Sequence, residues 1–345
     1  MSNNPGLALP ILDLSQLSGS ETDRSAFLSQ LRYAAREIGF FYLINHGISP
    51  ELQQAVQDEA RSFFSLPDED KQQVAMIHSP HFRGYNRAAS ELTRGQPDWR
   101  EQFDLGAERQ AFPPDEYAPA WRRLQGPNLW PAAQPELKPT LLQWQREMTA
   151  VALKLLRTFA EALSLPADAF DALYGSLPNE HIKLIRYPGQ SATQSSQGVG
   201  AHKDSGFLSF LLQDDKKGLQ VEVSPDNWVD AQPLPGSFVV NIGELLELAT
   251  NGYLRATVHR VVSPPQHEER QSIAFFLGAQ LNAVVPVYQL PEALVKEARG
   301  PESDPLNPLL RDVGWNYLKG RLRSHPDVAE RYYADVLRNS SELIA

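Results

Sequence analysis

The sequence contains no cysteine, which excludes disulfide bonds, thiolate metal ligands and a cysteine nucleophile. It has no apolar run near the ~18 residues of a membrane-spanning helix, and Met1–Pro10 lacks the basic and apolar pattern of a secretory signal. Positive charge is scarce, because 32 Lys and Arg residues stand against 42 Asp and Glu residues, a net charge of −10. This balance argues against nucleic acid or a membrane as the main partner. We expect a cytoplasmic protein.

The first half of the chain is predicted to be mixed α/β and then helical. Short strands and helices alternate up to residue 64, residues 78–134 are mostly loop, and an apolar stripe with helical spacing runs over residues 135–163. Ser49-Pro50 supplies a cap and a first-turn proline for one of these helices. The early elements are expected at 9–14 (strand), 25–36 (helix), 39–44 (strand) and 51–64 (helix).

From Ile182 to Leu277 the pattern changes to short β-prone runs separated by turns. So many short strands at close spacing favour a jelly-roll barrel, and thus an α+β protein with a mainly β core flanked by helices. We expect three segments: 1–134, mixed α/β; 135–290, a helix-backed jelly-roll core; and 291–345, a helical tail. The predicted strands are 182–187, 207–212, 219–223, 227–229, 237–242, 257–262 and 272–277.

A candidate metal-ligand set lies within this β-rich region, formed by His202-Lys203-Asp204 and His259. Two imidazoles and one carboxylate are the ligands of non-haem Fe(II) oxygenases. Residues two apart on a strand point to the same face, so His202 and Asp204 are predicted to reach one ion, and His259 to arrive on a distant strand. Three protein ligands leave positions open for water, a co-substrate and O2, which is typical of a catalytic site.

The remaining histidines have simpler explanations. We expect His46, in a turn between strand and helix, to be a hydrogen-bonded structural residue. His181 at the start of a strand is expected to be a hydrogen-bonded histidine at a strand edge. Solvent exposure is the expectation for His78, His81 and His267.

Arg270 and Ser272 form a second polar pair near the ligand set. They are two residues apart on a predicted strand and therefore share a face. A guanidinium binds a carboxylate through two hydrogen bonds, and the hydroxyl adds a third donor. An anion held there would suit a keto acid whose other end chelates the metal. Taken alone, the pair favours a surface arginine that pairs with Glu268 or Glu269, but beside the metal-ligand set we favour the anion site.

With these residues in view, most of the chain resembles the isopenicillin N synthase-like branch of the Fe(II)/2-oxoglutarate-dependent dioxygenases. The matching stretches are Leu9–Gly47, Gly200–Asp204, Leu212–Val221, Val240–Glu244 and Thr250–Gly252.

The resemblance implies a role for each of these polar groups. His202, Asp204 and His259 would bind iron, Arg270 and Ser272 would bind the distal carboxylate of 2-oxoglutarate, and Tyr187 before Pro188 would assist them. The implied cofactors are Fe(II), 2-oxoglutarate and O2, and the implied reaction hydroxylates or desaturates a small molecule and releases succinate and CO2. The chain departs from the family at Ile185, where asparagine is common, and at Lys203, where threonine is common.

Strand periodicity predicts further pocket residues. If Tyr187 faces the pocket, Ile185 and Lys183 face it too, and a pocket-lining Lys183 favours an anionic substrate. Lys183 could equally extend to solvent at the barrel rim. Tyr85 and Arg87, in the loop 82–90, are our candidates for substrate contact.

Three functions are consistent with this pattern. The leading hypothesis is an Fe(II)/2-oxoglutarate oxygenase that acts on a small molecule as a monomer or homodimer. An isopenicillin N synthase-type oxidase would take all four electrons from its substrate and need no keto acid. The Arg270-x-Ser272 motif does not distinguish this oxidase from the oxygenase. A non-catalytic jelly-roll protein could hold Zn(II) at the same ligands, but it would have little need of an open coordination face and an arginine fork.

Overall fold

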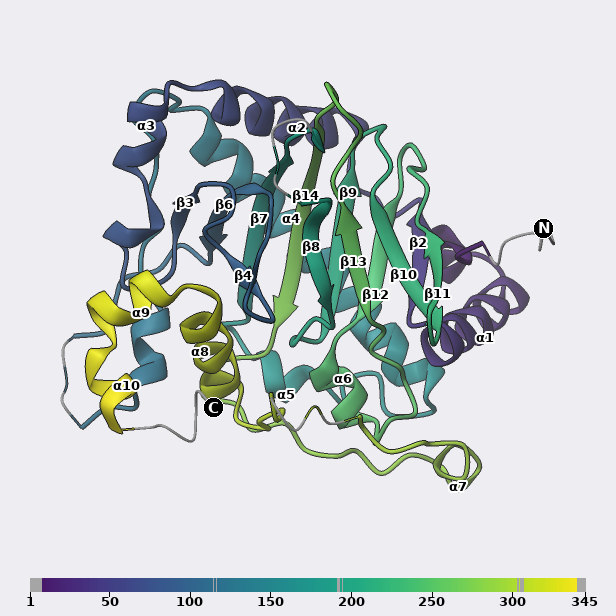
Figure 1. Ribbon diagram of the computed structural model, residues 1–345. Helices are drawn as coiled ribbons and strands as arrows, with labels where there is room; N and C mark the ends of the chain where they lie inside the picture. The colour runs from purple at the N-terminus through teal and green to yellow at the C-terminus, as the bar shows by residue number, and fades with distance from the viewer. Residues whose placement is uncertain are drawn as a thin grey trace.

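The computed structural model describes residues 8–339, apart from 114, 116, 191–192, 194, 303 and 305–306. Two β-sheets face each other to form a jelly-roll barrel, and helices cover the outside of the larger one (Figure 1). The α+β fold with a mainly β core is as predicted. Across the larger sheet the strands are β1 (Ile11–Asp13), β2 (Phe40–Ile44), β12 (Phe238–Ile242), β9 (Leu208–Gln213), β14 (Arg270–Gly278), β7 (Asn179–Tyr187), β6 (Glu101–Gly106) and β3 (Gly84–Asn86).

The smaller sheet has four strands, and a separate two-stranded hairpin lies next to it. All strand pairs except β1–β2 are antiparallel. In order, the smaller sheet contains β11 (Asn227–Asp230), β10 (Leu219–Ser224), β13 (His259–Val262) and β8 (Gln197–His202), and the hairpin contains β4 (Leu92–Thr93) and β5 (Gln96–Pro97).

Helix α2 begins at the predicted Ser49-Pro50 signal, whereas α1 begins four residues before the predicted start at residue 25. Ser20 and Asp23 form a capping box at the start of α1, and Ser49 caps α2 with Pro50 in its first turn. The helices are α1 (Glu21–Glu37), α2 (Pro50–Ser65), α3 (Asp68–Gln73), α4 (Leu137–Ala162), α5 (Asp171–Tyr174), α6 (Glu244–Ala249), α7 (Glu292–Val295), α8 (Val313–Ser324), α9 (Pro326–Tyr332) and α10 (Ala334–Asn339), with 3-10 turns at Leu14–Ser18, Met76–His78 and Ala120–Leu124.

Alternation along the strands of the larger sheet separates two environments. On β7, Ile182 and Leu184 face outward into a core shared with α1, α2 and α4, whereas Lys183, Ile185 and Tyr187 face the barrel interior. The apolar part of the interior is a second cluster to which both sheets contribute. A ligand inside the barrel is therefore enclosed by two sheets, and the helices stabilise the larger sheet from outside.

Two parts of the barrel wall were not predicted from the sequence. Residues 78–134, expected to be mostly loop, contain β3 and β6, which extend the larger sheet beyond β7. Strand β8, with the sequence Gln-Gly-Val-Gly-Ala-His, has too few apolar side chains to show strand alternation. The segment boundaries at 134 and 290 stay a prediction, although β1, β2, β3 and β6 join the sheet of the second segment.

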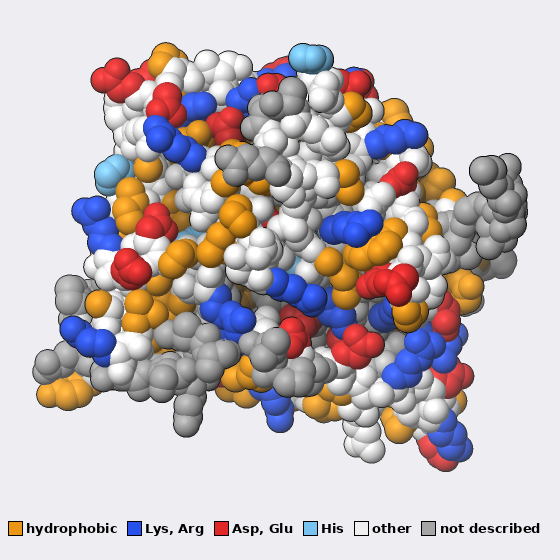
Figure 2. All heavy atoms as spheres, in the orientation of Figure 1, with side chains coloured by type: hydrophobic (Ala, Val, Ile, Leu, Met, Phe, Trp, Pro, Cys, Tyr) orange, Lys and Arg blue, Asp and Glu red, His pale blue; other side chains and the backbone are white. Residues whose placement is uncertain are grey.

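The surface is mixed in character. Acidic, basic and apolar side chains of the described residues are interspersed over the face shown in Figure 2. No helix in the described part of the chain is long and apolar enough to cross a membrane.

Candidate active site

The three predicted metal ligands meet at one end of the smaller sheet. His202 is the last residue of β8 and lies directly opposite His259, the first residue of β13. Asp204 Oδ1 lies 3.5 Å from Nε2 of His202 and 3.6 Å from Nε2 of His259. One ligand atom from each residue lies within 4.8 Å of the others, a spacing that one ion with bonds of about 2 Å can span.

The prediction that Asp204 shares a strand face with His202 is wrong. Strand β8 ends at His202, so Asp204 lies in the turn that follows and not on the same strand face. Its Oδ2 accepts hydrogen bonds from Ser209 Oγ at 2.6 Å and from Asn241 Nδ2 at 2.9 Å. Ser209 and Asn241 are direct partners on β9 and β12, so the larger sheet fixes the carboxylate.

Backbone carbonyls fix the orientation of both imidazoles. Nδ1 of His202 lies 2.8 Å from the Gly200 carbonyl, and Nδ1 of His259 lies 3.0 Å from the Thr257 carbonyl. Since a carbonyl only accepts, each Nδ1 carries a proton, and each Nε2 is directed toward Asp204. Such outer hydrogen bonds are typical of metal-binding histidines.

The charge states of Asp204 and His259 suit a cation. Burial by itself raises the pKa of Asp204, but the imidazoles of His259 and His202 and the Ser209 hydroxyl hold this pKa well below its usual range. Burial, and then the neighbouring His202, lower the pKa of His259 to about 4. At neutral pH Asp204 is therefore ionised and His259 neutral, the states in which both bind a metal.

Arg270 and Ser272 lie inside the barrel on β14, so the surface ion pair considered for Arg270 is excluded. Arg270 is fully buried, its Nη2 donates to Gln213 Oε1 at 2.9 Å, and its guanidinium lies 5.0 Å from the centre of the Tyr187 ring. Arg270 Nε and Nη1 and Ser272 Oγ have no hydrogen-bond partner among the described residues. A buried cation with unused donors fits a carboxylate, which accepts two bonds from the guanidinium and one from the hydroxyl.

The carboxylate slot and the metal ligands face each other across the barrel. Arg270 and Ser272 belong to the larger sheet, whereas His202 and His259 belong to the smaller one. Phe276, four residues or about 13 Å along β14 from Ser272, is the register partner of Ser209, which holds Asp204. The carboxylate slot and the metal ligands therefore lie at different levels of the same barrel interior.

Lys183 and Ile185 face the barrel interior, as strand periodicity predicted. The ammonium of Lys183 is not free, because Nζ lies 2.9 Å from Glu91 Oε1, 3.4 Å from Gln102 Oε1 and 3.7 Å from Asp104 Oδ1. It does not reach solvent at the rim, since Lys183 is buried. The wall beside the metal ligands is therefore polar and internally paired.

Tyr85 and Arg87 do not join the site, which corrects the prediction of substrate contact. The Tyr85 ring packs against Phe63 of α2 on the outer side of the sheet, and its hydroxyl donates to Glu101 Oε2 at 2.6 Å. Arg87 is exposed and pairs with Asp68. A short strand, β3, replaces the expected loop, and its pairing with β6 turns Tyr85 into the helix-side core.

The other histidines mostly follow expectation. His46 is buried in its turn and its Nδ1 accepts from the Ile48 N–H at 3.2 Å, and His181 is hydrogen-bonded inside the barrel to Asp104 at 2.9 Å. His78 and His267 are exposed. His81 is partly buried, because its Nδ1 donates to the Arg123 carbonyl at 2.7 Å.

Several site residues had no assigned role in the sequence analysis. Ser209, Asn241 and Gln213 support Asp204 and Arg270, and a polar residue within an otherwise apolar strand was the available signal for the first two. Asp98 and Arg100 lie in the region predicted to be mostly loop, and no local sequence pattern identifies them as site residues.

Two family profiles match the chain and define its class. Residues 9–133 match the profile described as non-haem dioxygenase in morphine synthesis N-terminal, and residues 178–279 match the 2OG-Fe(II) oxygenase superfamily. The chain therefore belongs to the isopenicillin N synthase-like Fe(II)/2-oxoglutarate-dependent oxygenases. It is a non-haem dioxygenase that uses Fe(II), 2-oxoglutarate and O2.

Individual relatives agree with this class. The chain is 36% identical to the 2-oxoglutarate-dependent dioxygenase frbJ of Dothideomycetidae sp., over 96% of this chain and 94% of the relative. It is 35% identical to homoarginine-6-hydroxylase 2-ODD-C23.1 of Arabidopsis thaliana, over 81% and 86% of the two chains. The crystal structure of a full-length Neurospora crassa protein in complex with alpha-KG and thymine superposes with a TM-score of 0.71 at 26% identity, over 97% of this chain and 99% of that chain.

The slot assignment predicts a selective defect in Arg270→Lys. Lysine keeps the positive charge but not the two-pronged geometry, so 2-oxoglutarate should bind about 10–100-fold more weakly, given that hydrogen bonds to charged groups contribute about 1.5–3 kcal/mol. Calorimetric titration of 2-oxoglutarate into the Mn(II)-loaded protein measures this. Mn(II) affinity without 2-oxoglutarate should stay unchanged, and unaltered 2-oxoglutarate affinity would refute the slot.

Proposed function

We propose that His202, Asp204 and His259 hold Fe(II), and that Arg270 and Ser272, with Tyr187 beneath the guanidinium, hold the distal carboxylate of 2-oxoglutarate. When bound, Fe(II), 2-oxoglutarate and O2 supply the oxidising power to remove hydrogen from a C–H bond, with release of succinate and CO2. The observation that carries this proposal is the buried Arg270 with two unpartnered donors facing the same interior as Asp204.

The charge balance of the barrel interior supports the keto acid. A divalent ion on Asp204 leaves one net positive charge, and the buried Arg270 adds a second. 2-Oxoglutarate is a dianion whose two carboxylates can neutralise these charges at opposite ends of the slot. Because unpaired buried charge is costly, the dianion is the ligand that the interior accommodates best.

The protein's own residues bind, orient and exclude water. Ser209 and Asn241 hold Asp204 Oδ2, which leaves Oδ1 directed toward the two Nε2 atoms. The interior between the two ends of the slot is lined by buried apolar side chains, among them Val221 and Ala274. Such a lining keeps bulk water from the reacting groups.

Anaerobic titration tests the reaction type directly. We expect 2-oxoglutarate added to the Fe(II)-loaded protein to produce a visible charge-transfer band, because chelation places the keto oxygen on the metal. In air, succinate should form, and its formation should increase with substrate. An oxidase that takes all its electrons from the substrate would give neither the band nor succinate, and this result would overturn the proposal.

We propose further that the substrate is a small polar molecule with an anionic group that binds Lys183 in competition with Glu91. Lys183 lies on the inner face of β7 in the row of Leu211 and Ala274, one inward-facing row from the level of Ser209. Two of the relatives above support a small polar substrate, since one is named for homoarginine hydroxylation and the other was crystallised with thymine.

Lys183→Met tests the anionic group. Loss of the ammonium should raise the substrate KM about 10-fold or more with less change in kcat, because the lost contact is made before and during the reaction. The comparison is Lys296→Met, which removes a lysine whose side chain is 71% exposed. An unchanged KM in Lys183→Met would remove the anion from the proposal and leave the oxygenase reaction intact.

A further inference from the structure

Strand β8, which carries His202, is the outer strand of the smaller sheet, and its free edge is covered by the segment that follows the β4–β5 hairpin. The Trp99 N–H donates to the Gln197 carbonyl at 3.0 Å, and the Gly200 N–H donates to Asp98 Oδ1 at 3.0 Å. These two bonds take the place of a fifth strand. An edge strand is otherwise free to shift, so this cover determines where β8 lies.

Asp98 is fully buried, and its carboxylate accepts hydrogen bonds from several donors. Oδ1 also accepts from Gln197 Nε2 at 3.2 Å, and Oδ2 accepts from Thr93 Oγ1 at 2.7 Å and lies 3.5 Å from Arg100 Nη2. A buried carboxylate with this number of donors is held in a single orientation. Asp98 is thus a rigid support, although it does not touch the ligand group.

Gly200 connects this support to the metal site. Its N–H is held by Asp98, and its carbonyl accepts the Nδ1 proton of His202 at 2.8 Å. A Cβ at position 200 would lie 2.8 Å from Thr93 Cγ2, so only glycine allows the hairpin to pack this closely on β8. The orientation of the His202 ring therefore depends on a residue that lies 102 positions before Gly200 in the chain.

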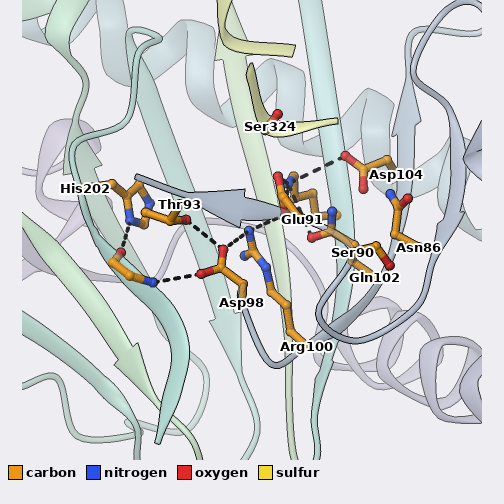
Figure 3. A network of polar contacts seen from close by, with 12 residues as sticks. Asn86, Ser90, Glu91, Thr93, Asp98, Arg100, Gln102, Asp104, His202 and Ser324 are labelled. Atoms are coloured by element: carbon orange, nitrogen blue, oxygen red, sulfur yellow. Dashed lines mark hydrogen bonds and ion pairs between the residues drawn. The ribbon is translucent and has the colours of Figure 1, made fainter. Parts of the chain in front are cut away.

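Asp98 is also connected to the larger sheet, on the opposite side of the barrel. Arg100 Nη2 pairs with Glu91 Oε2 at 2.5 Å, and Glu91 pairs with Lys183 of β7. Figure 3 shows the contacts running from His202 through Asp98 and Arg100 to Glu91. The hairpin is therefore attached to both sheets, at the metal ligand on one side and at the polar wall on the other.

We propose that Asp98 is a positioning residue for the metal centre: by fixing Gly200 it holds the His202 imidazole with Nε2 directed at the ion. This inference rests on the proposed metal site. We therefore expect that removing the Asp98–Gly200 contact weakens metal binding, although the three ligands are unchanged.

Metal affinity measured without turnover tests the role. Asp98→Ala should raise the Kd for Mn(II), followed by electron paramagnetic resonance, about 10–100-fold, the usual effect of removing an outer partner of a metal-binding histidine. It should also change the visible spectrum of the Co(II)-substituted protein, because the ring tilts. Asp98→Asn keeps an oxygen for the Gly200 N–H and should restore most of the affinity and the spectrum.

Asp230→Ala is the matched control, because it makes the same substitution at an exposed carboxylate on β11, the opposite edge of the smaller sheet, where Oδ1 accepts from Gln220 Nε2 at 2.9 Å. It should bind Mn(II) as the wild type does. If Asp98→Ala does not fold, Gly200→Ala separates the hairpin from β8 by its added methyl and should weaken Mn(II) binding. Wild-type Kd values in Asp98→Ala, or an equal loss in Asp230→Ala, would overturn the positioning role.

The outcomes also separate this inference from the proposed function. If the wild type binds no Mn(II), the metal site itself fails. If the wild type and Asp230→Ala bind Mn(II) and 2-oxoglutarate normally while Asp98→Ala also does, the site stands and only the role of Asp98 is lost.

Discussion

An ionised carboxylate inside the barrel, Asp204, is the constraint on which the other parts of the site depend. An isolated buried charge is strongly unfavourable, so the fold must supply partners for both oxygens. Ser209 and Asn241, facing each other on β9 and β12, bind one oxygen, and the imidazoles of His202 and His259 face the other. The larger sheet thus holds the carboxylate and the smaller sheet presents the two rings. In the proposed function a divalent cation binds between Oδ1 of Asp204 and the two Nε2 atoms.

Arg270 carries the second buried charge of the barrel interior. It lies on the larger sheet about one strand length from the level of Asp204, with Tyr187 against its face and Gln213 on one of its nitrogens. In the proposed function a ligand with carboxylates at both ends satisfies both charges at once, and the apolar lining excludes water. Glu91 pairs with both Lys183 and Arg100 inside the barrel, and we propose that the substrate binds at this pair.

The sequence predicted those parts of the site that follow from local spacing. His202-x-Asp204, Arg270-x-Ser272 and the inward alternation of Lys183 and Ile185 all depend on a two-residue period or a short motif. Strand β8 was not predicted, because glycines take the place of apolar residues. Tyr85 was misplaced, because its direction depends on pairing with β6, which the sequence did not mark. The support from Asp98 could not be predicted, since it joins residues about a hundred positions apart that no local pattern relates.

The most direct test of this account is the number of metal ions bound per chain, counted by electron paramagnetic resonance during Mn(II) titration of the wild type and of Asp204→Ala. The account predicts one tightly bound ion in the wild type, and none in the variant at the same concentrations, because two imidazoles without the carboxylate hold a hard cation poorly. Undiminished Mn(II) binding by Asp204→Ala would contradict it, because the ion would then lie elsewhere in the protein.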